Sequence, residues 1–291
     1  MNDFPMLDAV DMEILMHRDA HFSSSFPIMV EYYRKGGPGV MSDFSSERLL
    51  ELQYMEEKYG KNFCDIALPE AAKKEVSGAK EMYSRFREVY QGDSEVAKKL
   101  SDLILSEEDS PDDEIDAVMR MGPEMIPHLI DLIRSDHFYD PLYPGYGRSP
   151  ALAARCLGKM PDERALAPLF EAVGRGDFWA DECMMTALHG LGESAKVFLI
   201  ERLYTKPVTS ATYSACACLG CFSSDPEIGK AAWTVLKDPE YQKNDTLNAY
   251  LILLSENLDH ENDRREFTAW VEGLEKTDLI SEAQLIIKNW N

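Results

Sequence analysis

The segment ALAARCLGKMPDERALAPLFEAV, residues 151–173, contains two short apolar patterns joined by a turn. Three apolar residues precede Gly158 at steps of three, and such steps keep side chains on one face of a helix. Pro161 and Asp162 follow, and both residue types mark the start of a helix. The segment therefore predicts a helix, a turn and a second helix.

The same pattern recurs along the chain. Four glycines, Gly122, Gly158, Gly192 and Gly220, follow it at intervals of 28 to 36 residues. The residues one, four and seven positions before them are apolar or nearly so: Ile115, Val118, Met121, Ala151, Ala154, Leu157, Met185, Leu188, Leu191, Tyr213, Cys216 and Leu219. A second apolar helical pattern follows each glycine, with Lys196 as an exception. We expect each glycine to end a helix in the left-handed conformation.

This pattern resembles the HEAT repeat family, in particular the short HEAT-like repeats of bacterial and archaeal proteins. The resemblance is carried by residues 151–173, by MTALHGLGESAKVFLIERL (185–203) and by SACACLGCFSSDPEIGKAAWTVL (214–236). It covers roughly residues 110–237, with weaker units expected on both sides and to the C-terminus. It implies an all-α fold, a right-handed α-solenoid of HEAT-like helix pairs. The segments DFWADE and GRSP depart from the aspartate and arginine common in the family.

The regions flanking the repeats differ in regularity. We predict an irregular helical N-terminal region at residues 1–109 and a HEAT-like solenoid at residues 110–291. A last helix, SEAQLIIKNW (281–290), is expected to cap the solenoid with Ile280, Ala283, Ile287 and Trp290 on one face. Two further helices are predicted at SSERLLELQYMEEKYG (45–60), from a serine to Gly60, and at SPDDEIDAVMRMG (110–122), with an N-cap serine followed by proline.

The charge balance excludes some partners. The chain has 52 acidic and 30 basic residues, for a net charge of -22. Such a field repels nucleic acids and anionic membranes, so we expect neither as a partner. It suits a basic partner, or simply keeps the protein soluble. The start of the chain lacks the basic-then-apolar order of a signal peptide, and apolar runs such as AYLILL (249–254) are too short to span a bilayer. Six cysteines are few for a disulfide scaffold in a chain of this length. We therefore expect reduced thiols in a cytoplasmic protein.

No motif predicts catalytic residues, a metal or a cofactor. The pair Cys218 and Cys221 lacks the second pair that a zinc site needs, and packing thiols are the favoured interpretation. Glu13, His17 and His21 lie four apart and could bind a metal from one helix face, but a surface helix is favoured. The HEAT-like group includes an iron hydroxylase with paired His-Glu motifs, whereas this chain has one such dipeptide, at His260.

One segment, RSDHFYDPLYPGYGRSP (134–150), is an aromatic-rich insertion between two helical patterns. Insertions in repeat proteins emerge on one face, often the binding face, and the next connection, GRGDFWADE (174–182), is also aromatic. We expect both connections to form one binding patch: His137, Phe138, Tyr139, Tyr143, Tyr146, Arg148, Phe178 and Trp179. Alternatively, the rings fold back as a packed loop, or Phe138 and Trp179 are buried while the tyrosines stay exposed.

The sequence favours a non-catalytic interaction scaffold or adaptor. It would bind a protein or peptide through the aromatic patch and an acidic surface that selects basic segments. One alternative is a HEAT-like lyase-type enzyme or enzyme accessory, with a ligand in the concave groove. Another is an acidic neutraliser of a basic protein, as in a toxin-immunity factor.

Overall fold

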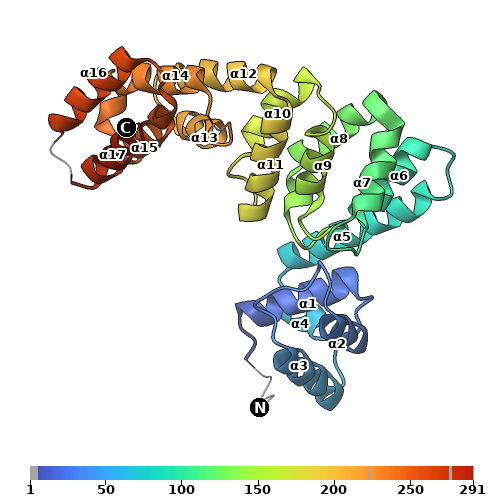
Figure 1. The fold of residues 1–291 in the computed structure, drawn as a ribbon. Coiled ribbons are helices and arrows are strands. Elements are labelled where there is room, and N and C mark those ends of the chain that lie inside the picture. Colours follow the sequence, from blue (N-terminus) through green and yellow to red (C-terminus); the bar gives the residue numbers. More distant parts are fainter. Residues whose placement is uncertain (1–5, 223, 275–276, 291) are drawn as a thin grey trace. The chain divides into compact units, whose positions relative to one another are not determined.

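The computed structural model describes residues 6–222, 224–274 and 277–290, and over these residues the chain is helical, with no strand. The predicted all-α class is confirmed. The chain divides into two compact units, Met1–Ala153 and Ala154–Asn291 (Figure 1). The predicted boundary after residue 109 lies inside the first unit, and the outer ends of the predicted regions, residues 1–5 and 291, lie outside the described residues.

The first unit has an apolar core that lies between its first four helices. Its helices, with η for a 3-10 helix, are α1 (Ala9–His21), α2 (Phe26–Lys35), α3 (Ser46–Tyr59), α4 (Phe63–Ala67), α5 (Glu70–Val89), α6 (Glu95–Ile104), α7 (Asp112–Met121), η1 (Gly122–Met125), α8 (Ile126–Arg134) and η2 (Asp136–Tyr139). Helix α1 contacts α4 and α5, and α2 contacts α3. The core between them includes Ile14, Leu15, Phe26, Met29, Leu49, Leu52 and Phe63.

Capping residues set the ends of two predicted helices. The hydroxyl of Ser45 accepts a hydrogen bond from the Arg48 amide at 3.1 Å, and Gly60 ends α3 in the left-handed conformation, as predicted. Helix α7 begins one residue later than expected, because Pro111 occupies the N-cap position. The Ser110 hydroxyl donates to the Asp112 carboxylate at 3.0 Å instead of capping the helix.

The second unit is a succession of helix pairs. Helix α9 (Ser149–Leu157) crosses the division between the units, and the rest are η3 (Glu163–Ala165), α10 (Leu166–Ala172), α11 (Phe178–Gly190), α12 (Glu193–Leu203), α13 (Ser210–Leu219), α14 (Pro226–Leu236), η4 (Tyr241–Lys243), α15 (Asp245–Leu254), η5 (Ser255–Asn257), α16 (Glu261–Glu272) and α17 (Thr277–Asn289). Helices α11, α13, α15 and α17 contact one another in that order. Helix α14 contacts both α12 and α16. Alternate helices therefore pack side by side in two sets.

The predicted apolar positions lie in the core. The residues that lie one, four and seven positions before each repeat glycine are all buried or half-buried. The exception in the second pattern, Lys196, is also buried, and its ammonium lies 2.9 Å from Glu193 and Glu227 and 3.1 Å from Asp225. Its aliphatic stem thus occupies the apolar position while three carboxylates surround the charge.

The predicted conformation of the repeat glycines is wrong. Gly122 and Gly192 have positive φ but ψ of -154° and -132°, outside the left-handed helical region. Gly220 is right-handed helical, and Gly158 has no positive φ. The glycine position therefore has no common backbone requirement.

Close packing explains Gly158. A Cβ there would lie 2.7 Å from the Cα of Ala187, and a Cβ on Gly190 would collide with the Gly158 carbonyl. Two glycines thus let α11 approach the turn after α9 at backbone distance. In α17 the buried positions are Leu279, Ala283 and Ile286. The stripe therefore differs from the predicted one, in which Ile280, Ile287 and Trp290 are half-buried.

Candidate functional site

The aromatic-rich segment packs inside the first unit. Leu142 and Tyr143 form one apolar cluster with Ala20 of α1 and Ala79 of α5. Tyr143 is 4% exposed, and its hydroxyl donates to a Glu75 carboxylate oxygen at 2.8 Å. Tyr143 therefore supports the packed-loop alternative, because a side chain this buried offers almost no area to a partner.

Tyr146 is held by a backbone turn and by two other segments. It has a φ of 55° between Gly145 and Gly147, which also have positive φ. Its hydroxyl donates to Glu107 at 2.9 Å, and a Cβ on Gly39 would lie only 2.5 Å from its ring. Because Gly39 has no side chain, the Tyr146 ring fits against it. Tyr146 thus links the segments that contain Gly39 and Glu107 within the first unit.

Two histidines of α1 contribute to the same region. His21 Nε2 lies 3.1 Å from the Pro141 carbonyl oxygen, which only accepts, so this nitrogen carries the proton and Nδ1 accepts from the Tyr83 hydroxyl at 2.7 Å. Burial lowers the pKa of His21 to about 3 and that of His17 to about 4. The interpretation of this face as a surface helix is wrong at His17, which is buried against Phe44, and at the half-buried His21, whereas Glu13 is exposed.

The remaining predicted site residues differ in exposure. In the first unit, the Tyr139 hydroxyl donates to the Ile133 carbonyl at 2.9 Å, and Arg148 donates to the carbonyls of residues 108 and 109. His137 is exposed and Phe138 is half-buried. In the second unit, Phe178 and Trp179 are the first residues of α11, 84% exposed and half-buried respectively. These residues belong to two different units, and the single shared patch stays a prediction.

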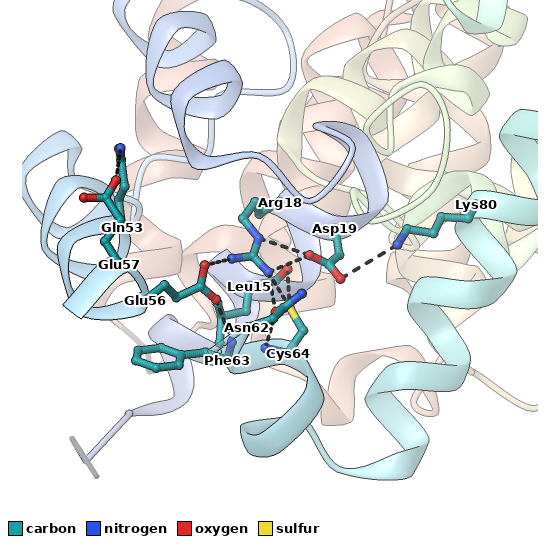
Figure 2. Close-up of polar contacts among 10 residues, drawn as sticks. All are labelled: Leu15, Arg18, Asp19, Gln53, Glu56, Glu57, Asn62, Phe63, Cys64 and Lys80. Atoms are coloured by element: carbon teal, nitrogen blue, oxygen red, sulfur yellow. Dashed lines mark hydrogen bonds and ion pairs between the residues drawn. The ribbon is translucent and has the colours of Figure 1, made fainter. Parts of the chain in front are cut away.

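A buried arginine lies at the centre of a polar cluster in the first unit (Figure 2). The Arg18 guanidinium donates to Asp19 at 2.8 and 3.0 Å, to Asn62 at 2.9 Å and to Glu56, and it contacts the Cys64 sulfur at 3.0 Å. All three of its nitrogens are engaged, so the cluster joins α1, the end of α3 and the start of α4. We interpret it as structural.

The predicted packing role of the cysteines holds for Cys218 but not for Cys221, which is exposed. All six are free, and five of them are buried: Cys64, Cys156, Cys183, Cys216 and Cys218. Burial raises the pKa of the Cys216 and Cys218 thiols to about 12, which suppresses the reactive thiolate. Within the described part of the chain, no group of three or more histidine, cysteine or acidic side chains is arranged to hold a metal ion.

The second unit contains a groove with a volume of about 1000 Å³. It is bordered by α11, α13, α15 and α17, the first set of alternate helices, and by the turns that follow α13 and α15. Ala217 and Gly220 lie among its lining residues, and Tyr250 and Leu253 expose 38% and 52% of their surface there. Exposed apolar side chains beside small residues can receive apolar side chains of a partner.

Part of the lining of this groove is polar. The exposed carboxylates of Glu256 and Asp259 line it. The Trp290 indole donates to the Glu256 carbonyl at 2.9 Å, and Arg264 donates to the Leu258 carbonyl at 2.6 Å while its guanidinium lies 5.2 Å from the centre of the Trp290 ring. The turn after α15 is thus held in place from α16 and from the end of α17.

Comparison with known protein families finds no match for this chain, and no curated protein matches it either. No helix within the described ranges combines the length and the apolar character needed to cross a bilayer.

Proposed function

We propose that this protein is a non-catalytic scaffold that binds a segment of a partner protein in the groove of its second unit. The observation that carries the proposal is the groove itself, about 1000 Å³ with Tyr250 and Leu253 exposed along it. Large apolar side chains exposed in a concave site are typical of surfaces that become buried when a partner binds.

The contact pattern of the second unit supports a HEAT-like stack. A helix contacts its sequence neighbour and the helix two further on, as in α11, α13 and α15. This is the arrangement in which each repeat buries its apolar face against the next. We therefore keep the right-handed HEAT-like solenoid as the proposed architecture of this part of the chain.

One predicted binding residue fits this groove. Phe178 and Met185, which lines the groove, lie seven residues apart on α11, and this spacing places them on the same helix face. Phe178 is therefore a proposed extension of the binding surface. The free cysteines agree with a proposed cytoplasmic location.

The proposal is tested with two matched variants of the full chain. Leu253→Glu places a charge in the groove, whereas Leu285→Glu makes the same change on α17, at a side chain that is 60% exposed and does not line the groove. Affinity capture with quantitative mass spectrometry should show a specific protein that is lost with Leu253→Glu and kept with Leu285→Glu. Equal capture by both variants would contradict the proposal.

A further inference from the structure

Resting on the proposed function, we propose that the groove of the second unit binds a basic amphipathic segment, in which Lys or Arg lies beside a large apolar side chain. The observation behind this is that apolar and acidic parts of the groove adjoin. Tyr250 and Leu253 of α15 supply the first, and Glu256 and Asp259, directly after that helix, supply the second.

The apolar part provides the anchor for the segment. Ala217 and Gly220 of the α13 side are small, so the backbone of a bound segment can approach closely there. Tyr250 and Leu253, in the same lining, are exposed to solvent. A bound segment that covers these two side chains removes apolar surface from water. A volume of about 1000 Å³ holds a few side chains, which fits one or two turns of helix or a short extended peptide rather than a whole domain surface.

The acidic part selects the charge of the segment. One carboxylate oxygen of Glu256 accepts a hydrogen bond from the Asn289 side-chain amide at 3.0 Å. The side chains of Glu256 and Asp259 are both exposed. Among the described residues that line the groove, Arg264 is the only cation; its Nε donates to the Leu258 carbonyl and its guanidinium lies over the Trp290 ring, so these contacts fix its position. Approach of an acidic segment is opposed both by these carboxylates and by the net charge of -22.

The test begins with a selection. The full chain is used to select short random peptides displayed on phage, and the enriched peptides are synthesised with a fluorescein label. Binding is then measured by fluorescence anisotropy at low and high salt. We expect the enriched peptides to combine Lys or Arg with Leu, Ile or Phe.

Matched variants locate the bound peptide. We expect Leu253→Glu to weaken binding at least about tenfold, the loss that follows from one uncovered leucine, and Leu285→Glu to leave it within about twofold. The double variant Glu256→Gln with Asp259→Asn should weaken binding about three- to tenfold at low salt and less at high salt. A control pair that removes the same charge from exposed residues outside the groove, Glu171→Gln with Glu201→Gln, should have little effect.

The outcomes of these experiments distinguish the basic character of the partner from the use of the groove as the binding site. Enriched peptides that lack basic residues but still depend on Leu253 would overturn the basic partner and leave the proposed function standing. Failure of every enriched peptide to respond to Leu253→Glu would overturn both. Thermal unfolding of each variant, together with Leu253→Ala, which adds no charge, separates loss of binding from loss of folding.

Discussion

Arg18 shows how one side chain connects three segments of the first unit. It is fully buried, and its partners Asp19 and Glu56 are mostly buried with it. Arg18→Met should lower the free energy of unfolding by about 3–5 kcal/mol, because it leaves the mostly buried Glu56 without its cation and Asp19 with only the more distant Lys80, at 3.8 Å. The exposed pair of Arg164 with Asp162 is the control, and Arg164→Met should change stability little. Urea unfolding of the two variants measures both, and equal effects would contradict the structural role.

His17 and His21 make the stability of the protein depend on pH. Their pKa values in the folded protein, about 4 and about 3, lie below the value of 6.5 for a free histidine, so the unfolded chain binds protons first. Stability is therefore full above pH 6.5 and falls as the pH drops toward 4 and then 3. Asp140 limits the shift of His17.

Urea unfolding at pH 7 and pH 5 measures this dependence. The shift of His17 alone corresponds to a loss on the order of 3 kcal/mol between pH 6.5 and 4. His17→Leu and His21→Gln, the latter able to donate to the Pro141 carbonyl, should each flatten the fall between pH 7 and pH 5. A slope unchanged in both variants would show that other groups cause it.

The junction between α11 and the turn after α9 depends on the absence of side chains. Gly190→Ala raises helix propensity, yet its Cβ would meet the Gly158 carbonyl, so we expect a net destabilisation of about 1–3 kcal/mol. Gly273→Ala is the control, because its Cβ would lie 3.4 Å from the nearest atom at a negative φ. Differential scanning calorimetry should show a lower melting temperature for the first variant alone.

Two of the predicted binding residues, one from each aromatic connection, differ sharply in burial. Tyr143 and Phe178 were both predicted as binding residues, but one is 4% and the other 84% exposed. Tyr143→Ala should cost about 3–5 kcal/mol of stability, as large-to-small core substitutions do, whereas Phe178→Ala should cost little. Thermal unfolding of the two variants tests this. A stable Tyr143→Ala protein would place the ring outside the core.

At the level of helices, periodicity predicted most of the structure. Apolar steps placed the repeat positions in the core because a helix must bury one face. The same steps could not reveal why Gly158 is a glycine, since its neighbours Ala187 and Gly190 come from α11, two α-helices further along the chain. Nor could they show that the tyrosines pack inward, because Gly39, Glu75 and Glu107 lie far from them in sequence.

For the molecule as a whole, the sequence indicated the charge, the helical class and, as one alternative, a concave groove, but it did not indicate which residues line the groove. Its described lining residues run from Met185 of α11 to Trp290 after α17, more than a hundred residues of chain, so no local motif marks it. The available signal was AYLILL (249–254), which is apolar on every face of α15, so that Tyr250 and Leu253 stay exposed when the opposite face is buried.

Site-specific photo-cross-linking in living cells gives the most direct test that the groove binds a partner protein. A photoreactive phenylalanine derivative would replace Leu253 in one full-length variant and Leu285 in another. We expect a covalent adduct with one protein at position 253 and none at position 285, with the cross-linked peptide carrying Lys or Arg beside an apolar residue. No adduct at position 253, or the same adducts at both positions, would contradict binding in the groove.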